Sequence, residues 1–216
     1  GDTCKGPLTI SITAFGKIPR GQSILRSGAK VGDGIWVSNM VGDARLALAA
    51  IQNEWPLNLS AAEQSMINVR LHSPTPRIEL GIALRGIASA ALDISDGLLG
   101  DLKHILEASG VNAEVNMDAI PCSSVLKKQS LEIRHLCSAR GGDDYELCFT
   151  AHPSQDSQIE SISKQLNIPL NCIGSIINKK GGDEIRMILK DQSGKELGID
   201  ETKKLLQSFD HFHPSS

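Results

Sequence analysis

The stretch Leu92-Asp93-Ile94-Ser95-Asp96-Gly97-Leu98 places two carboxylates and a hydroxyl where a strand pattern gives way to a helix pattern. Asp93 and Ser95 alternate with apolar residues, so an extended backbone points both polar side chains the same way. Asp96 is a suitable N-cap, and apolar residues then recur at helical spacing as far as Gly110, a suitable C-cap. Oxygen ligands beside a helix N-terminus suit a hard cation such as Mg²⁺ and a phosphate group.

An ordinary helix cap is the alternative interpretation of this stretch. Taken alone, an Asp-Gly pair before an apolar run is more often a cap than a binding site. Asp93 changes that balance, because a cap needs only one carboxylate. We therefore predict metal-bridged phosphate binding around Asp93 and Asp96.

Length and composition define the broad class of protein. The chain has 216 residues, of which 40% are hydrophobic and 22% charged, as expected for a globular fold of one domain or slightly more. Its net charge of -3 argues against nucleic acid as a partner, and no apolar run reaches the length of a membrane span. The five cysteines are odd in number and scattered, which favours free thiols and a cytoplasmic location.

The beginning of the chain predicts a missing upstream part. The sequence starts Gly1-Asp2-Thr3, without a methionine, and soon reaches Leu8–Phe15, where apolar and polar residues alternate as in a half-buried strand. We interpret this strand as the last of a truncated N-terminal domain. The predicted division is residues 1–29 for the remnant and linker and 30–216 for a C-terminal α/β domain.

Strand and helix patterns alternate along the rest of the chain. Strands are predicted at 35–37, 111–117, 145–150, 170–177 and 185–189, with a turn at 179–183 joining the last two. Helices are predicted at 44–53 (with Asp43 as cap), 78–91, 98–109, from Ser123 onward, and 159–166. This order predicts an α/β or α+β sandwich with one mostly covered sheet.

Several motifs at the ends of these elements resemble one known family when they are taken together. Singly each is weak, since a glycine pair is usually a turn and a terminal aromatic usually packs. In this order they resemble thiamine-monophosphate kinase, of the superfamily that includes aminoimidazole ribonucleotide synthetase, over nearly the whole chain. The matching pieces are Gly1-Asp2-Thr3, Arg26-Ser27-Gly28-Ala29, Pro74-Thr75-Pro76-Arg77, Asp93-Ile94-Ser95-Asp96-Gly97-Leu98 and Gly142-Asp143-Asp144-Tyr145-Glu146-Leu147.

The resemblance implies transfer of the ATP γ-phosphoryl group to the phosphate of thiamine monophosphate. Both reactants are anions, so Mg²⁺ ions and an arginine are needed to bring them together. No catalytic side chain is expected, because the acceptor phosphate attacks directly. The Mg²⁺ ligands implied are Asp2, Asp93 and Asp96. The ATP contacts implied are Gly1, Asp2, Arg26 and Ser95. The thiamine-phosphate contacts implied are Asp143 and Phe209, the carboxylate facing the cationic thiamine and the ring covering it.

The family's upstream Asp-rich loops and its dimer-forming domain are missing from this sequence. We therefore expect the parent protein to be a homodimer, and this chain alone to be weakly active or inactive. Two alternatives stay open: another ATP-using enzyme of the superfamily with a different acceptor, and a non-catalytic remnant that serves only as a partner surface.

Overall fold

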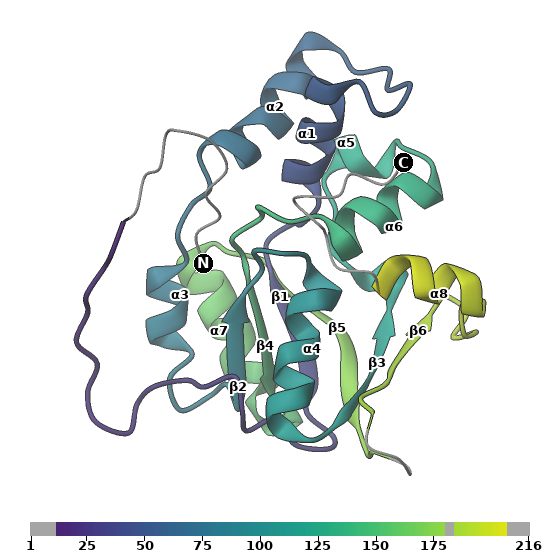
Figure 1. Cartoon of the computed structure of the whole chain (residues 1–216). Helices are drawn as coiled ribbons and strands as arrows, with labels where there is room; N and C mark the ends of the chain where they lie inside the picture. The colour runs from purple at the N-terminus through teal and green to yellow at the C-terminus, as the bar shows by residue number, and fades with distance from the viewer. Residues whose placement is uncertain (1–11, 180–183, 207–216) are drawn as a thin grey trace.

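The computed structural model describes residues 12–179 and 184–206, which form a mixed six-stranded sheet with helices on both faces (Figure 1). The elements are β1 Gly34–Ser38, α1 Asp43–Gln52, α2 Ala61–His72, α3 Ile78–Ala83, β2 Ala90–Asp93, α4 Leu98–Ser109, β3 Asn112–Asn116, η1 Met117–Ala119, α5 Ser124–Lys127, α6 Leu131–Arg140, β4 Leu147–Ala151, η2 Pro153–Gln155, α7 Asp156–Leu166, β5 Leu170–Ile177, β6 Met187–Lys190 and α8 Ile199–Leu206.

The strand order of the sheet is β2-β4-β1-β5-β3-β6. Neighbours are antiparallel except β3 and β6, which are parallel. Strand β2 lies at the edge, and its last residue, Asp93, pairs with Leu147 at the start of β4. The sheet therefore brings the end of β2 and the beginning of β4 to the same place, although about fifty residues separate them in the sequence.

Side chains alternate between the two faces of the sheet and fill a separate core on each. Ile35 and Val37 point to the face that α4 covers, together with parts of α6 and α8. Trp36 points the other way, toward α3 and α7, and stacks on Phe149 with 6.2 Å between ring centroids. A third cluster joins α1, α2 and α5 and covers one end of the sheet (Figure 1). The predicted α/β class with one covered sheet is confirmed.

Several predicted elements differ from the structure. The predicted helix 78–91 ends at Ala83, since Gly86 has a φ of 75° and Ala90 and Ala91 pair with β4 as strand β2. The strands predicted on either side of the turn at 179–183 are not neighbours, because β3 lies between β5 and β6; residues 180–183 lie outside the described part of the chain. Helix α1 begins at Asp43 rather than after it, and its N-cap is Gly42.

The predicted strand Leu8–Phe15 is wrong where it is described. Residues 12–15 are in no strand, and the side chains of Ile12 and Phe15 are exposed. An alternating sequence becomes a strand only when a neighbouring strand takes its backbone hydrogen bonds, and the sheet takes none from these residues. Residues 8–11 lie outside the described part of the chain.

Two expectations from composition can be compared with the structure. The four cysteines in the described ranges are free thiols: Cys122, Cys137, Cys148 and Cys172. In the same ranges, no helix is both long and apolar enough to span a membrane.

Candidate functional site

The loop from Asp93 to Gly97 leaves the sheet edge and enters α4. Leu92 and Ile94 are buried, Asp93 is exposed and Ser95 half-buried, as the alternation predicts. Asp96 is not the N-cap: Gly97 occupies that position with φ 114° and ψ 137°, and no side chain caps the helix there. The predicted C-cap Gly110 is confirmed, with a left-handed φ of 67°.

Asp101 replaces the expected cap from inside the first turn of α4. Its Oδ2 accepts hydrogen bonds from the backbone N–H of Ser95 at 2.9 Å and of Asp96 at 3.0 Å. The loop is thus folded back over a buried carboxylate, while the Asp96 side chain stays exposed. Sequence reasoning missed Asp101, because the pattern alone does not say which carboxylate accepts the hydrogen bonds of the loop's backbone N–H groups.

The second motif, residues 141–146, lies directly against this loop. The N–H of Asp143 donates to the Ser95 carbonyl at 2.9 Å, and that of Tyr145 to the Ile94 carbonyl at 2.8 Å. The approach is too close for side chains: a Cβ added at Gly142 would lie 2.6 Å from the Ser95 oxygen. At Gly97 it would lie 2.7 Å from the Arg140 oxygen. The structure therefore brings together the two motifs on which the family resemblance mainly depends.

Residues 143–146 point alternately outward and inward. Asp143 (φ 66°) and Tyr145 (φ 50°) adopt the left-handed region, which is uncommon for residues with a Cβ and concentrates at functional sites. Asp143 is half-buried and Tyr145 is exposed, whereas Asp144 and Glu146 are 1% and 0% exposed. Both oxygens of Asp144 accept from the N–H of Gly42 at the start of α1, at 3.0 and 2.8 Å.

The outward carboxylates share one electrostatic environment. Burial raises the pKa of Tyr145, and the charge of Asp143, a hydrogen bond to it, and the charges of Asp93 and Asp96 raise it further. The Tyr145 hydroxyl donates to Asp143 Oδ1 at 3.4 Å. Burial likewise raises the pKa of Asp101, with the charges of Asp96 and Asp93 adding and its backbone hydrogen bonds opposing. These carboxylates therefore form a negative patch at the N-terminus of α4.

The donors of this patch suit a hard cation that is only partly held by protein. Asp93, Asp96 and Asp143 offer oxygen ligands alone, which fits Mg²⁺ better than a soft metal. Within residues 12–179 and 184–206, no group of three or more His, Cys, Asp or Glu side chains encloses a metal position. Mg²⁺ characteristically uses one or two carboxylates together with phosphates and water, so the residues present fit that ion.

The Arg26 loop lies along the outer edge of β2. The Leu25 carbonyl accepts from the N–H of Ala91, and the N–H groups of Gly28 and Ala29 donate to the Ser109 hydroxyl at 3.1 and 3.2 Å. These contacts run toward the beginning of β2, away from Asp93. At about 3.3 Å per strand residue, the Arg26 backbone is roughly 10 Å along the edge from Asp93. The Arg26 side chain is exposed, and its contact with ATP stays a prediction.

Three predicted site residues cannot be placed. Gly1, Asp2 and Phe209 lie outside the described residues, so their expected contacts stay predictions. Asp93, Ser95, Asp96 and Asp143 are the predicted residues that the fold gathers.

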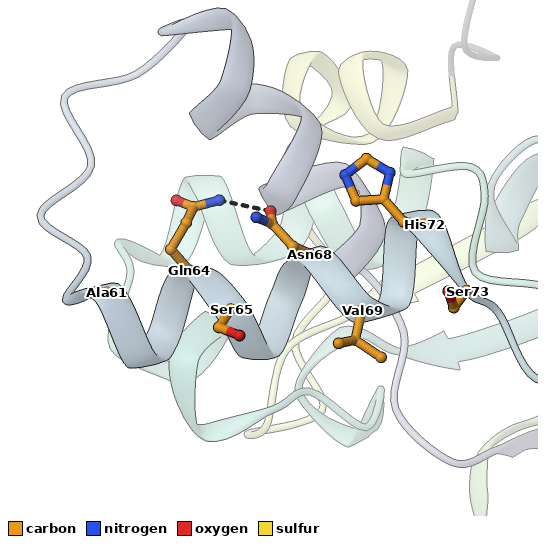
Figure 2. A pocket seen from close by; sticks show the side chains of 7 residues that line it. All are labelled: Ala61, Gln64, Ser65, Asn68, Val69, His72 and Ser73. Carbon is orange, nitrogen blue, oxygen red and sulfur yellow. Dashed lines mark hydrogen bonds between the residues drawn. The ribbon is translucent and has the colours of Figure 1, made fainter.

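A separate depression lies along α2 and contains no predicted site residue. Its volume is about 440 Å³, and it is lined by Ala61, Gln64, Ser65, Asn68, Val69, His72 and Ser73. Figure 2 shows Gln64 and Asn68 turned toward each other; the Gln64 amide donates to Asn68 Oδ1 at 2.7 Å. This surface is a feature of one helix and is distinct from the two acidic loops.

Fold and site together define an α/β domain with a carboxylate-lined edge. The chain belongs to the family "AIR synthase related protein, C-terminal domain", which it matches over residues 30–186. A thiamine-monophosphate kinase of Haemophilus influenzae is 44% identical over 218 residues, covering 100% of this chain and 63% of that protein. The chain thus spans less than two thirds of this relative's length.

Solved structures give the same result. The thiamine-monophosphate kinase of Stenotrophomonas maltophilia K279a superposes with a TM-score of 0.72 at 41% identity, over 79% of this chain and 54% of that one. AaThiL complexed with AMPPCP and TMP superposes with a TM-score of 0.59 at 26% identity, over 81% of this chain and 52% of that one. The resemblance inferred from the sequence is confirmed.

Proposed function

We propose that the protein containing this chain transfers the γ-phosphoryl group of ATP to thiamine monophosphate, giving thiamine diphosphate and ADP. The observation that carries the proposal is the contact between the Asp93–Gly97 loop and the Gly141–Glu146 loop, which gathers three outward carboxylates. The proposal is supported by relatives that are thiamine-monophosphate kinases and by the likeness to AaThiL with AMPPCP and TMP.

Each gathered residue has a role in this proposal. Asp93 and Asp96 would hold Mg²⁺, which when bound neutralises part of the phosphate charge. Ser95 and Arg26 would contact ATP, the guanidinium forking onto phosphate oxygens. Asp143 would face the cationic part of thiamine. Because the acceptor phosphate is itself the nucleophile, the protein contributes positioning and electrostatics rather than a reacting side chain.

The larger organisation belongs to the same proposal. Residues 1–29 would belong to the upstream domain and its linker, and 30–216 to the C-terminal domain; the family match beginning at residue 30 supports this division. The whole protein would work in the cytoplasm as a homodimer joined through the upstream domain. Since that domain would supply further metal ligands, this chain alone should turn over slowly or not at all.

The direct test is isothermal titration of the chain with a non-hydrolysable ATP analogue, with Mg²⁺ and with a chelator. We expect Mg²⁺-dependent binding that weakens at least tenfold in Asp96→Asn, because one of the two proposed ligands is lost. Glu160→Gln is the matched control, since Glu160 is an exposed acid on α7, across the sheet.

Two results would count against these assignments. Binding that is equally strong in the chelator would contradict the role of Asp93 and Asp96. No binding at all would show that the upstream loops hold the nucleotide and that this chain serves as a scaffold.

A further inference from the structure

The carboxylate of Glu146 is the most heavily bonded side chain beside the site. Arg77 grips it with two hydrogen bonds, Nε to Oε2 and Nη2 to Oε1, both 2.6 Å long. Arg70 Nη2 donates to Oε1 at 2.6 Å, Asn39 Nδ2 to Oε1 at 2.9 Å, and Ser38 Oγ to Oε2 at 2.6 Å. A carboxylate offers about four acceptor positions, so Glu146 is saturated.

These donors come from three parts of the fold. Ser38 ends β1 and Asn39 follows it, Arg70 is in the last turn of α2, and Arg77 is the N-cap of α3. Arg70 is not one of the residues that line the depression along α2. Glu146 itself immediately precedes β4, so its side chain joins the sheet to both helices where the acidic loops meet.

The same residue also fixes the backbone of the acidic loops. The Glu146 carbonyl accepts from the N–H of Ile94 at 2.8 Å, next to the Asp143 and Tyr145 hydrogen bonds. Asp143 and Tyr145 have a left-handed backbone, and the residues that alternate with them, Asp144 and Glu146, are buried. Rotation of Glu146 out of its network would therefore redirect Asp143.

We propose that Arg77, acting through Glu146, is a positioning residue that holds Asp143 in its outward orientation for the acceptor. This rests on the proposed function, in which Asp143 faces the cationic part of the acceptor. The paired N–H groups of a guanidinium fix the orientation of a carboxylate as well as its charge, which a single ammonium group cannot do. The guanidinium of Arg77 therefore does more than add a positive charge beside Glu146.

Charge explains why Arg77 rather than Arg70 is the informative position. Arg70 also faces Asp43 and Asp144, and its charge lowers the pKa of both against the larger effect of burial. Removal of Arg70 would leave three buried acids with one arginine and disturb the whole region. Removal of Arg77 leaves Glu146 paired with Arg70 and removes only the two hydrogen bonds from the Arg77 guanidinium.

The experiment is amide hydrogen exchange by NMR on the whole chain and its variants. In Arg77→Gln we expect exchange at least tenfold faster at the amides of Asp143 and Tyr145, with the core amide of Phe149 unchanged. Arg77→Lys keeps the positive charge without the paired hydrogen bonds, so its exchange rates should lie between those of wild type and Arg77→Gln. Arg134→Gln is the matched control, because it removes a partly buried arginine paired with Asp118. Unchanged loop exchange, or a rise shared by Phe149 or by the control, would overturn the proposal.

A binding measurement separates positioning from general damage. We expect Arg77→Gln to weaken thiamine monophosphate binding about tenfold and to leave the affinity for the ATP analogue unchanged. Equal loss of both ligands would show a merely structural role and overturn the proposal. If the wild-type chain binds neither ligand, the proposed function fails for this chain, and the exchange rates alone decide whether Arg77 positions the loop.

Discussion

Replacing Gly97 by alanine tests the contact between the two acidic loops. The substitution meets two separate obstacles: a backbone at φ 114°, which side chains rarely adopt, and a Cβ 2.7 Å from the Arg140 carbonyl oxygen. Strain of this kind costs about 1–3 kcal/mol, and overpacking in a buried site about 1–3 kcal/mol. The expected loss in the free energy of unfolding is therefore about 2–6 kcal/mol.

Three other glycines separate these two costs. Gly110 has a left-handed φ of 67° and open space around it, so Gly110→Ala reports strain alone, about 1–2 kcal/mol. Gly142 lacks a positive φ but would place a Cβ 2.6 Å from the Ser95 oxygen, so Gly142→Ala reports the contact alone. Gly81, in helix α3, has neither obstacle, and Gly81→Ala should stabilise by about 0.5–1 kcal/mol.

The assay is urea unfolding at equilibrium, followed by the fluorescence of the two tryptophans. The expected order of stability is Gly81→Ala, wild type, Gly110→Ala or Gly142→Ala, and last Gly97→Ala. The cost at Gly97 should be at least the sum of the costs at Gly110 and Gly142, because its φ and ψ lie outside the left-handed region that alanine can adopt at position 110. A Gly97→Ala variant no less stable than Gly110→Ala would refute the tight packing of the two loops.

Two further predictions concern ionisation. Tyr145 is the single tyrosine, so its absorbance at 295 nm should titrate above the usual value of about 10, and Asp143→Asn should lower this pKa by removing a neighbouring charge. An unchanged midpoint in that variant would contradict the shared patch. Burial raises the pKa of Asp144 well above its usual range, so its contribution to stability is complete below about pH 4 and is lost as pH rises through the raised pKa. The side chain of Asp144→Asn can still accept from Gly42 but cannot ionise. Its urea midpoint relative to that of wild type should therefore be higher at pH 8 than at pH 4. The same difference in midpoint at both pH values would disprove this.

Local sequence patterns predicted the elements but not how they meet. Strand β5 has the predicted bounds, because its apolar residues stand between Pro169 and Asn178, which do not favour a strand. The helix 78–91 was overextended, because pairing of Ala90 and Ala91 with β4 outweighs helical spacing. Helix α2 was missed although its N-terminus carries a capping box, Ser60 with Glu63, which the sequence displays as S-x-x-E.

The site was predictable only as a set of separate pieces. The family resemblance named Asp93, Asp96 and Asp143, and the pairing of β2 with β4 explains why they are neighbours. The roles of Asp101 and Arg70 could not be predicted, because each depends on a partner that only the fold supplies. Arg77 stood in a recognised motif, but no local pattern connects it to a glutamate sixty-nine residues later.

The division of charge in the 143–146 segment explains how one loop can be both rigid and able to bind. Its inward acids are satisfied by protein. Asp144 accepts from the backbone N–H of Gly42, and the hydrogen bonds that Glu146 accepts from Arg77, Ser38 and Asn39 outweigh burial and lower its pKa. Its third carboxylate, on Asp143, is only half-buried, so it avoids the full cost of burying a charge. A loop held by its own buried acids needs no ligand to take its shape. We therefore expect the acidic loops to keep this arrangement in the chain by itself, even if the proposed upstream domain is needed for turnover.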